Sequence, residues 1–365
     1  MSHYDYFIVG AGITGVTAAS ILARKKDKKV LVVEKRPHIG GNCYDHFDDH
    51  GVLIHEYGPH IFHTQHKDVW EYLSRFTKWI PYVHRVKAFV DNKLVSLPIN
   101  IKTLEDLFGR VFTREDMSKW VEKERVIISE PDNAEDMVLS RMGKTIYEKF
   151  FKNYTTKQWG KDARELAPEV TARIPIRFSE DDRYFTDLYQ GIPQDGYTRM
   201  LERMLKHKNI EVIFDTDYKQ IIDSINFSQM TFTGPIDYFF DYQFGPLPYR
   251  GLKFNFNSHK RENYQPLAVV NYPNNYGYTR ITEFKHMTMQ KHPYTTLCYE
   301  YPHDCVPGEN SIVPSYPLPI KEAAELYNKY KDNADKLKGV TFLGRLAEYK
   351  YYNMDVCVKV AMDSL

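Results

Sequence analysis

Four histidines fall within twelve residues near the start of the chain. His60 and His63 lie three residues apart in the stretch EYGPHIFHT, and His55 and His66 flank that pair. Such a cluster could ligate zinc, but no carboxylate or cysteine is spaced to complete a tetrahedral set. Pro59 also favours an extended loop. We therefore expect no metal here, and the histidines are left with two interpretations, a structural role or contact with a cofactor.

Arginines and tyrosines form a second constellation, spread along the chain. The stretch NYTTKQWG (153–160) places rings and hydroxyls in one predicted loop, and Arg173 lies between prolines in a predicted exposed segment. Tyr184 and Phe185 follow an acidic run. Arg280 lies in YTRIT, inside a predicted strand, where a charge is unusual unless it is paired. Each alone is most simply a surface arginine or a packed ring. Together they predict a diphosphate site with rings for a base and a sugar.

A glycine-rich turn precedes both constellations. Gly10-x-Gly12-x-x-Gly15 follows a predicted strand at 4–9 and opens a predicted helix at 13–24. The first glycine permits the tight turn, the second lets the backbone approach a pyrophosphate, and the third allows close packing of helix on strand. The pyrophosphate then meets the free N–H groups of the helix N-terminus. This context predicts a dinucleotide site.

The second predicted strand, at 29–34, ends in a residue that helps to define the dinucleotide. Glu34 lies nineteen residues after Gly15, where a carboxylate accepts from a ribose hydroxyl and would repel a 2′-phosphate. Gly40, Gly41 and Asn42 follow, and residues 43–60 show no further helix and parallel strand. This arrangement favours FAD over NAD. No second GxGxxG is visible, so we expect an external reductant such as NAD(P)H.

Composition narrows the class of protein. The 365 residues carry a net charge of +1 with 27% charged residues, which gives no sign of a nucleic-acid surface. The mean hydropathy is −0.53, and neither a membrane span nor a signal peptide is evident. The four cysteines form no CxxC pair, so we expect free thiols and a cytoplasmic location.

Apolar patterning predicts a chain of two or three domains. Short β-rich runs fill residues 210–310, and a buried strand is predicted at 339–344. Helices are predicted at 13–24, 103–108, 118–128, 134–142, 144–154, 196–206 and 321–338, and from 354. A late buried strand that ends in glycine is typical of a chain returning to its first nucleotide-binding sheet. We therefore expect the first domain to be discontinuous.

Several longer motifs together resemble one family. They are VGAGITG, GGNCYD, EYGPHIFHT, PYVHRVKAFV, SLPINI, NYTTKQWG, YTRIT and FLGRLAEYKYYNMDV. In this order, over nearly the whole chain, they resemble the bacterial UDP-galactopyranose mutases. The resemblance implies an α/β fold with a discontinuous Rossmann-like FAD-binding domain (1–78, 208–236 and 336–365), a helical substrate and dimer domain (100–165) and a twisted antiparallel β-sheet domain (79–99, 166–207 and 237–335). It also implies a homodimer.

The same resemblance implies a reaction. The family interconverts UDP-galactopyranose and UDP-galactofuranose without net redox change, and galactofuranose serves the synthesis of cell-surface polysaccharide. The flavin must be reduced, because its N5 attacks the sugar C1, UDP leaves, and the adduct opens and recloses through the other hydroxyl. The difficult chemistry then belongs to the cofactor, and the protein holds UDP and poises C1.

The resemblance also assigns roles to residues. Arg173 and Arg280 would grip the diphosphate, and His63 would lie near the reacting face of the flavin. The expected cofactor-binding residues are Gly10, Gly12, Ile13, Thr14, Gly15, Glu34, Lys35, Gly41, Asn42, His60, Ile61, Tyr218, Gly344, Arg345, Met354, Asp355 and Val356. The expected substrate-binding residues are His84, Phe150, Tyr154, Thr155, Trp159, Arg173, Tyr184, Phe185, Asn271, Arg280, Tyr316 and Tyr351.

Two positions depart from the family pattern, and two other functions stay open. His84 stands where the family often has Asn, and Asn353 stands where it often has Asp. Both positions lie near the substrate or flavin in the family, so two interpretations stay open, an altered sugar preference or neutral exchanges. The same dinucleotide motifs fit an FAD-dependent amine oxidase or desaturase, and the arginines and rings also fit a nucleotide-sugar binding protein without activity.

Overall fold

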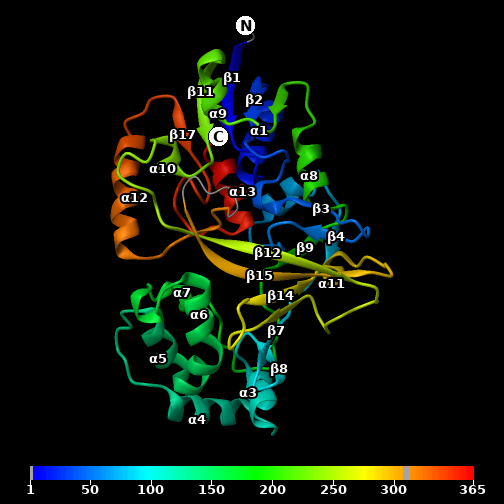
Figure 1. Cartoon of the computed structure of the whole chain (residues 1–365), viewed down its shortest axis with the longest axis vertical. Coiled ribbons are helices and arrows are strands. Elements are labelled where there is room, and N and C mark those ends of the chain that lie inside the picture. The colour runs from blue at the N-terminus through cyan, green and yellow to red at the C-terminus, as the bar shows by residue number, and fades with distance from the viewer. Residues whose placement is uncertain (1–2, 307–312) are drawn as a thin grey trace.

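A computed structural model describes residues 3–306 and 313–365 of the chain. Residues 1–2, in the expected FAD-binding domain, and residues 307–312, in the expected sheet domain, lie outside the described residues. Three tiers follow one another down the long axis (Figure 1). A parallel sheet with its helices lies at the end that holds the N-terminus, a long sheet crosses the middle, and a block of helices forms the other end.

The first tier is a five-stranded sheet in which every pairing is parallel. Its order is β10-β2-β1-β11-β17, with β10 at Ile210–Ile213, β2 at Val30–Val33, β1 at His3–Val9, β11 at Asn226–Phe232 and β17 at Val340–Phe342. All of β2, VLVV, is buried, as expected for a parallel sheet covered on both faces. The late strand does complete the N-terminal sheet, as its sequence predicts.

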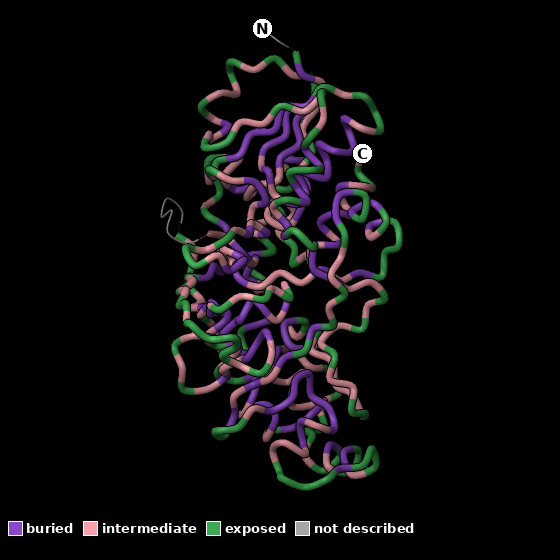
Figure 2. Tube along the Cα trace, turned by 90° about the vertical axis from the view of Figure 1, so that its right-hand side faces the viewer, coloured by how far each residue is buried: buried purple, intermediate pink, exposed green. Residues whose placement is uncertain are grey.

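Three helices cover one face of this sheet. They are α1 (Ile13–Lys26), α8 (Gly196–Leu205) and α13 (Met354–Asp363). Their apolar side chains share one core with strands β1 and β2. The opposite face has its own core, in which Phe7, Leu31 and Phe232 pack together. Figure 2 shows buried residues running through the interior of this end of the molecule, with exposed residues around its outside.

The second tier is a seven-stranded sheet. Its order is β16-β12-β15-β14-β13-β7-β8, with β16 at Tyr316–Pro317, β12 at Tyr249–His259, β15 at Thr295–Cys305, β14 at Arg280–Glu283, β13 at Val269–Asn271, β7 at Val86–Val90 and β8 at Lys93–Leu97. The pairings are antiparallel except that of β13 with β7, so the expected antiparallel sheet is in fact mixed. The long excursion between β8 and β13 supplies the crossover that a parallel pairing needs.

Helices make up the third tier. They are α3 (Ile101–Phe108), α4 (Arg114–Glu124), α5 (Ala134–Ile146), α6 (Lys152–Trp159) and α7 (Glu169–Ala172), with a π-helical turn at Tyr147–Phe151 and a 3₁₀ turn at Ala163–Glu165. Asn100 and Thr113 begin α3 and α4 with capping boxes. The prediction of a helix to residue 128 was wrong, because α4 ends at Glu124 and residues 125–128 are extended or irregular.

The prediction of a loop at 153–160 was also wrong, because most of this stretch is helix α6. Thr155, Gln158 and Trp159 are buried along this helix, so packing stabilises a segment whose polar composition suggests a loop. Gly160 ends the helix with φ at +67°, a conformation that glycine adopts without steric cost.

Smaller elements connect the tiers. Strands β5 (Phe62–Thr64), β9 (Tyr189–Pro193) and β6 (Trp79–Pro81) form a three-stranded sheet, and β3 (Asp45–Phe47) pairs with β4 (Leu53–His55). The other helices are α2 (Lys67–Leu73), α9 (Tyr218–Ile221), α10 (Ile236–Phe239), α11 (Lys285–Thr288) and α12 (Lys321–Ala334), with 3₁₀ turns at Gly41–Cys43 and Ile222–Ser224. Among the described helices none is long and apolar enough to cross a membrane. All four cysteines are free thiols, as predicted.

Candidate active site

The glycine-rich turn has the geometry that a pyrophosphate requires. Gly10 has φ at +102°, and a Cβ on Gly15 would lie 2.0 Å from the Gly10 carbonyl oxygen. Helix α1 begins after Gly12 without a side-chain cap and has no acidic residue in its first turn. The N–H groups at this helix end are therefore free to bind an anion.

Glu34 joins the turn to the second strand. One carboxylate oxygen accepts from the Ala11 N–H at 2.8 Å, and the other accepts from the Arg36 N–H at 2.9 Å. The carboxylate is buried and keeps lone pairs for a further donor such as a ribose hydroxyl. The Lys35 ammonium points elsewhere, because it lies 3.2 Å from an Asp217 oxygen.

The second glycine pair lies directly against the first turn. The Gly40 N–H donates to the Ala11 carbonyl at 2.8 Å, and a Cβ on Gly41 would lie 2.9 Å from the Gly12 Cα. The Asn42 amide oxygen accepts from the Arg36 guanidinium at 2.9 Å. Two stretches of backbone thus pass within contact distance, which only glycine permits here.

Residues from the end of the chain meet the same turn. Gly344 has φ at +94°, and a Cβ there would lie 2.7 Å from the Thr14 hydroxyl. Arg345 donates to the Tyr352 carbonyl at 2.9 Å and to the Ser315 carbonyl at 3.1 Å. Met354, Asp355 and Val356 form the first turn of α13, which packs against α1 where Ile13 also lies. Tyr218 does not join them, because its ring packs in the core on the other face of the sheet.

The histidine loop is built around a hydrogen-bonded His60. Its Nδ1 bonds to the Gly58 carbonyl at 2.8 Å, and its backbone N–H donates to Nδ1 of His55 at 3.0 Å. Burial lowers the pKa of both imidazoles to about 3, so both are neutral. Ile61 packs against the core of the helical tier. Among the described residues no three potential ligands gather into a metal site.

Arg280 lies at the centre of the arginine and tyrosine constellation. It begins β14, directly opposite Asn271 on β13 and Glu300 on β15. Its Nε lies 3.2 Å from a Glu300 oxygen, and its Nη2 donates to the Tyr154 hydroxyl at 3.3 Å. Burial disfavours the charge, but the Glu300 carboxylate outweighs this and raises the pKa of Arg280. The charge in the strand is therefore paired, as the sequence requires.

This cross-strand row also contains unsatisfied polar atoms. Asn271 Oδ1, Arg280 Nε and Glu300 Oε1 are buried and have no hydrogen-bond partner within the described chain. Buried polar groups left without partners are rare, and a bound polar ligand is one way to satisfy them. The row therefore marks a place where a ligand would complete the hydrogen bonding.

Two more arginines lie over a pair of stacked tyrosines. The Tyr316 and Tyr351 rings stack at 5.4 Å, with the Arg173 guanidinium 4.6 Å from the Tyr351 ring and that of Arg345 5.6 Å from the Tyr316 ring. Desolvation raises the pKa of the Tyr351 phenol, but Arg173 and Arg345 outweigh it and lower that pKa overall. The region is electropositive, which suits a diphosphate.

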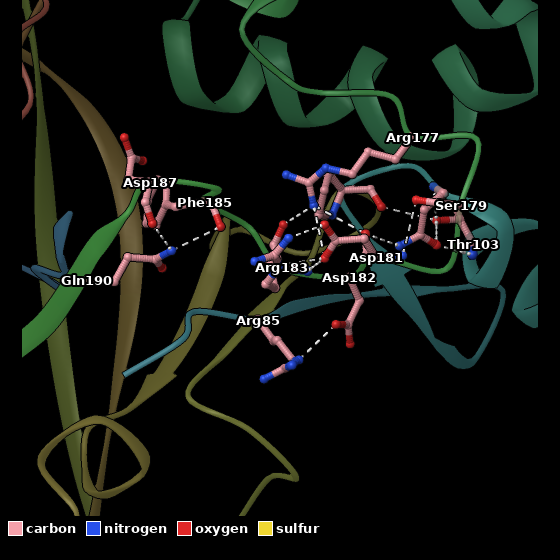
Figure 3. Close-up of polar contacts among 12 residues, drawn as sticks. Arg85, Thr103, Arg177, Ser179, Asp181, Asp182, Arg183, Phe185, Asp187 and Gln190 are labelled. Carbon is pink, nitrogen blue, oxygen red and sulfur yellow. Dashed lines mark hydrogen bonds and ion pairs between the residues drawn. The ribbon is translucent and has the colours of Figure 1, made fainter. Parts of the chain in front are cut away.

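A third group of side chains gathers around Phe185. Its ring stacks on His63 at 3.6 Å and on His84 at 5.8 Å, and the Tyr184 N–H donates to the His84 carbonyl at 2.7 Å. His84 is fully buried, and this burial lowers its pKa to about 3. The His63 ring bonds through Nδ1 to the Asp187 carboxylate at 2.9 Å. The segment that carries Phe185 and Asp187 is drawn in Figure 3.

Helix α6 contributes from the helical tier. Tyr154 reaches Arg280, and the Trp159 ring meets Tyr316 edge-on at 6.3 Å. Phe150 and Thr155 are buried, and Phe150 belongs to the helical core. The structure thus brings most of the expected substrate residues together, while Phe150 packs in the core behind them.

Sequence reasoning missed three residues of this region. Glu300 could have been found by the argument used for Arg280, since it is also a charge inside a predicted strand. Asp187 follows Tyr184 and Phe185 by two residues, but nothing in its neighbours predicts contact with His63. The Lys157 ammonium donates to the carbonyls of Tyr272, Tyr276 and Tyr278 at 2.6, 3.0 and 3.1 Å, a contact that only folding creates.

The fold and this geometry define a dinucleotide-binding protein of the Rossmann-like class, and residues 8–76 match the family described as NAD(P)-binding Rossmann-like domain. Residues 149–351, more than half of the chain, match the family described as UDP-galactopyranose mutase. The chain is 39% identical to the "Probable UDP-galactopyranose mutase" of Klebsiella pneumoniae, over 99% of this chain and 94% of that protein. It is 36% identical to the dTDP-fucopyranose mutase of Escherichia coli, over 98% of this chain and 96% of that protein.

A solved structure of reduced UDP-galactopyranose mutase shares the fold, with a TM-score of 0.78 at 17% identity, covering 99% of this chain and 94% of that one. These matches place the chain in a family of isomerases. It belongs to the UDP-galactopyranose mutase family.

Proposed function

We propose that this enzyme interconverts UDP-galactopyranose and UDP-galactofuranose. The observation that carries the proposal is the convergence of Arg173, Arg280 and Arg345 on Tyr154, Tyr316 and Tyr351, beside the glycine-rich turn. Guanidinium groups bind diphosphates strongly, and hydroxyl-bearing rings suit a nucleoside and a sugar. Family membership supplies the reaction type.

We infer that the cofactor is FAD, bound by the glycine turn, Glu34, Gly41 and the Gly344 loop. The uncapped N-terminus of α1 and the contact between Gly12 and Gly41 fit a dinucleotide pyrophosphate. In the reduced state the flavin would supply N5 as a nucleophile toward the sugar C1, with electrons from an external donor such as NAD(P)H.

The chain's own residues then bind, orient and shield. Arg280 and Arg173 hold the diphosphate while the anomeric C–O bond breaks, and their charges stabilise the departing UDP. Tyr184, Tyr316 and Tyr351 add hydroxyl donors, and Tyr154 and Trp159 line the pocket for the base. His63 holds and moves a proton near the sugar hydroxyls. No net oxidation occurs, so the protein needs no redox partner during turnover.

Separation of the two nucleotide sugars by HPLC tests this function. Dithionite-reduced protein should convert UDP-galactofuranose to UDP-galactopyranose, and oxidised protein should not. Cyanoborohydride added during turnover should couple radiolabelled sugar to the flavin. Conversion that is equally fast with oxidised protein would contradict the role of reduced FAD, and reduced protein that binds UDP without conversion would be a binding protein.

A second substrate is favoured by the E. coli relative, whose name gives dTDP-fucopyranose. His84 and Asn353, which depart from the mutase pattern, motivate the same test. Conversion of dTDP-fucopyranose faster than UDP-galactopyranose in parallel assays would reassign the sugar while keeping the reaction. Hydrogen peroxide formed with an amine substrate would instead support the oxidase alternative.

We further propose that the enzyme is a cytoplasmic homodimer that supplies cell-surface polysaccharide synthesis. The family resemblance and the four free thiols support this setting. Light scattering coupled to size-exclusion chromatography should give twice the 43.0 kDa chain mass. A monomer at micromolar concentration would contradict the dimer.

A further inference from the structure

His63 is held on its edge by a carboxylate, that of Asp187, which has no role in the proposed function. His63 belongs to β5 and Asp187 precedes β9, the strand that pairs with β5. The Nδ1 of His63 lies 2.9 Å from an Asp187 oxygen, and the side chains are 12% and 24% exposed. A pair this well shielded keeps more of its interaction than a surface pair does.

The same imidazole is also held on its face. The Phe185 ring lies 3.6 Å from it at an interplanar angle of 13°, and His84 stacks near the Phe185 ring at 5.8 Å. The carboxylate sets the rotation of the ring in its plane, and Phe185 sets the plane itself. Together they fix the orientation of His63 before any ligand binds.

Asp187 is in turn held by the strand opposite His63. Gln190 is the cross-strand partner of His63, and its side-chain amide donates to the Asp187 carbonyl at 2.9 Å and the Phe185 carbonyl at 3.3 Å (Figure 3). The Leu188 N–H donates to the Gln65 side chain at 3.4 Å. The carboxylate and the imidazole are therefore both positioned by the hydrogen-bonded pair of strands β5 and β9.

This arrangement defines a tautomer. A carboxylate only accepts hydrogen bonds, so a neutral His63 must carry its proton on Nδ1 and present a lone pair on Nε2. In the described part of the chain, Nε2 makes no hydrogen bond. Asp187 contacts the ring directly. His84 lies beyond Phe185 and is neutral because burial lowers its pKa to about 3. Asp187 is thus the ionisable group that hydrogen-bonds to His63.

We propose that Asp187 is a positioning residue that keeps His63 in the Nδ1–H tautomer, so that Nε2 serves as the proton acceptor for a sugar hydroxyl. The inference rests on the proposed mutase function. Ring opening comes first and adds a proton to the oxygen of the old ring, and ring closure then takes a proton from the hydroxyl oxygen that closes the new ring. One imidazole can give the first proton from Nε2 and accept the second at the same atom, so protons balance over the cycle without an outside acid.

The tautomer can be measured without turnover. Long-range ¹H–¹⁵N spectra of the [¹⁵N]histidine-labelled, oxidised flavoprotein should show His63 as Nδ1–H, with the His63→Gln variant identifying its signal. Asp187→Leu removes the acceptor and should shift His63 mainly to the Nε2–H form. Wild-type protein with His63 as Nε2–H would overturn the proposal, and this readout stands even if the wild type converts no sugar and the proposed function fails.

Kinetics supply the second measurement. For Asp187→Leu we expect kcat to fall about 100-fold with KM within about twofold, the scale of a general base. Asp187→Asn keeps a hydrogen-bond acceptor without the charge, so its kcat should lie between those of the wild type and Asp187→Leu. In a His63→Gln background, Asp187→Leu should cause little further loss. Full additivity in that double variant would overturn the positioning role.

Asp182→Asn is the matched control. Asp182 lies on the same segment and pairs with Arg85 at 2.8 Å, away from His63. This variant should keep the wild-type kcat, pH profile and histidine spectrum. Flavin absorbance and melting temperature should be close to the wild type for all Asp187 variants. An equal loss of kcat in Asp182→Asn would show that the segment matters only for folding.

Discussion

At the residue scale, the site depends on charged side chains that are stabilised only by tertiary contacts. Arg280 is partly buried at a strand end and keeps its charge because Glu300 lies opposite and Tyr154 accepts from it. A buried guanidinium without such partners would be strongly unfavourable. The same ion pair leaves Nε of Arg280 and Oε1 of Glu300 without hydrogen-bond partners in the described chain. The residue is thus stabilised in the fold while part of its hydrogen bonding awaits a ligand.

Arg280→Ala should reduce mutase activity strongly. Loss of one charge-assisted hydrogen bond costs about 1.5–3 kcal/mol, which is roughly a 10- to 100-fold loss in kcat/KM. Isothermal titration should also show weaker binding of UDP, because UDP carries the diphosphate that Arg280 is proposed to bind. Arg261→Ala, at an exposed arginine that lies over Tyr264, is the control and should change neither value. Wild-type turnover in Arg280→Ala would show that Arg280 does not bind the diphosphate.

The buried histidines should make the protein sensitive to acid. His55, His60 and His84 have pKa values lowered to about 3 by burial, against an ordinary value of 6.5. Between these values the unfolded chain binds protons that the folded chain does not, so the free energy of unfolding falls as the pH falls below about 6.5. Each histidine contributes up to about 1.4 kcal/mol per pH unit in this window.

His84→Asn should remove about one third of the acid-induced fall in the free energy of unfolding, because it removes one of the three buried histidines. We expect the drop in melting temperature between pH 7.5 and pH 5.5 to be smaller in the variant than in the wild type, because Asn takes up no proton on unfolding. Differential scanning fluorimetry of the oxidised flavoprotein measures it. An equal drop in both proteins would mean that His84 is not a neutral buried imidazole. The same variant restores the family's usual residue, so its substrate preference can be assayed in parallel.

At the element scale, the Lys157 ammonium is one of several groups that connect helix α6 to the long sheet. Lys157 donates to three carbonyls of the segment between β13 and β14, and Asn153 donates to Asn274 at 2.9 Å. Helix α6 carries Tyr154 and β14 carries Arg280. These contacts therefore determine how closely Tyr154 and Arg280 approach each other. Lys157 therefore acts on the site from outside it.

Lys157→Met should loosen this connection. It leaves three partly buried carbonyls without a charged donor, which costs about 1–3 kcal/mol. We expect a lower melting temperature and a higher KM, with kcat changed less than in Arg280→Ala, because the arginine itself remains. Lys152→Met, at an exposed position of the same helix, is the matched control and should resemble the wild type. A Lys157→Met protein with unchanged KM would show that the other contacts of α6, such as that of Arg250 with the Gln158 carbonyl, are enough to hold the helix in place.

At the whole-molecule scale, we propose the three-part division into a discontinuous dinucleotide domain, a helical domain and a sheet domain. Three separated segments of the chain supply the five strands of the first sheet, from residue 3 to residue 342. Helix α8 lies within a segment expected in the sheet domain, yet it packs on α1 in the core of the first sheet. The packing therefore favours moving α8 into the dinucleotide domain.

Hydrogen exchange with and without FAD tests this division. If the cofactor holds the separated segments together, its removal should increase exchange in residues 10–26, 40–43 and 340–358 at the same time. The helical block at 101–159 should change little, because it shares its core with the long sheet and not with the first sheet. An equal increase in both regions would contradict a separate dinucleotide domain. Reconstitution with FAD should reverse the change.

The sequence by itself determined the dinucleotide turn, because glycines at fixed spacing leave few alternatives for the backbone. It also predicted the return of the chain at residues 339–344, because a buried apolar run needs a sheet to cover it. The longer motifs were sufficient to indicate the family. The spacing around the histidines at 60 and 63 lacks the further ligands of a metal site, so the sequence favours other roles for them.

Tertiary structure decided the rest, because its interactions join residues that are far apart in the chain. Asp187 meets His63 across 124 positions, and the three carbonyl partners of Lys157 lie 115 to 121 positions away. The helical state of residues 153–159 also required packing, since their local preferences suggest a loop. Local chemistry therefore identified which groups could act, and only the packing of β5 on β9 and of α6 on the long sheet determined which of them act together.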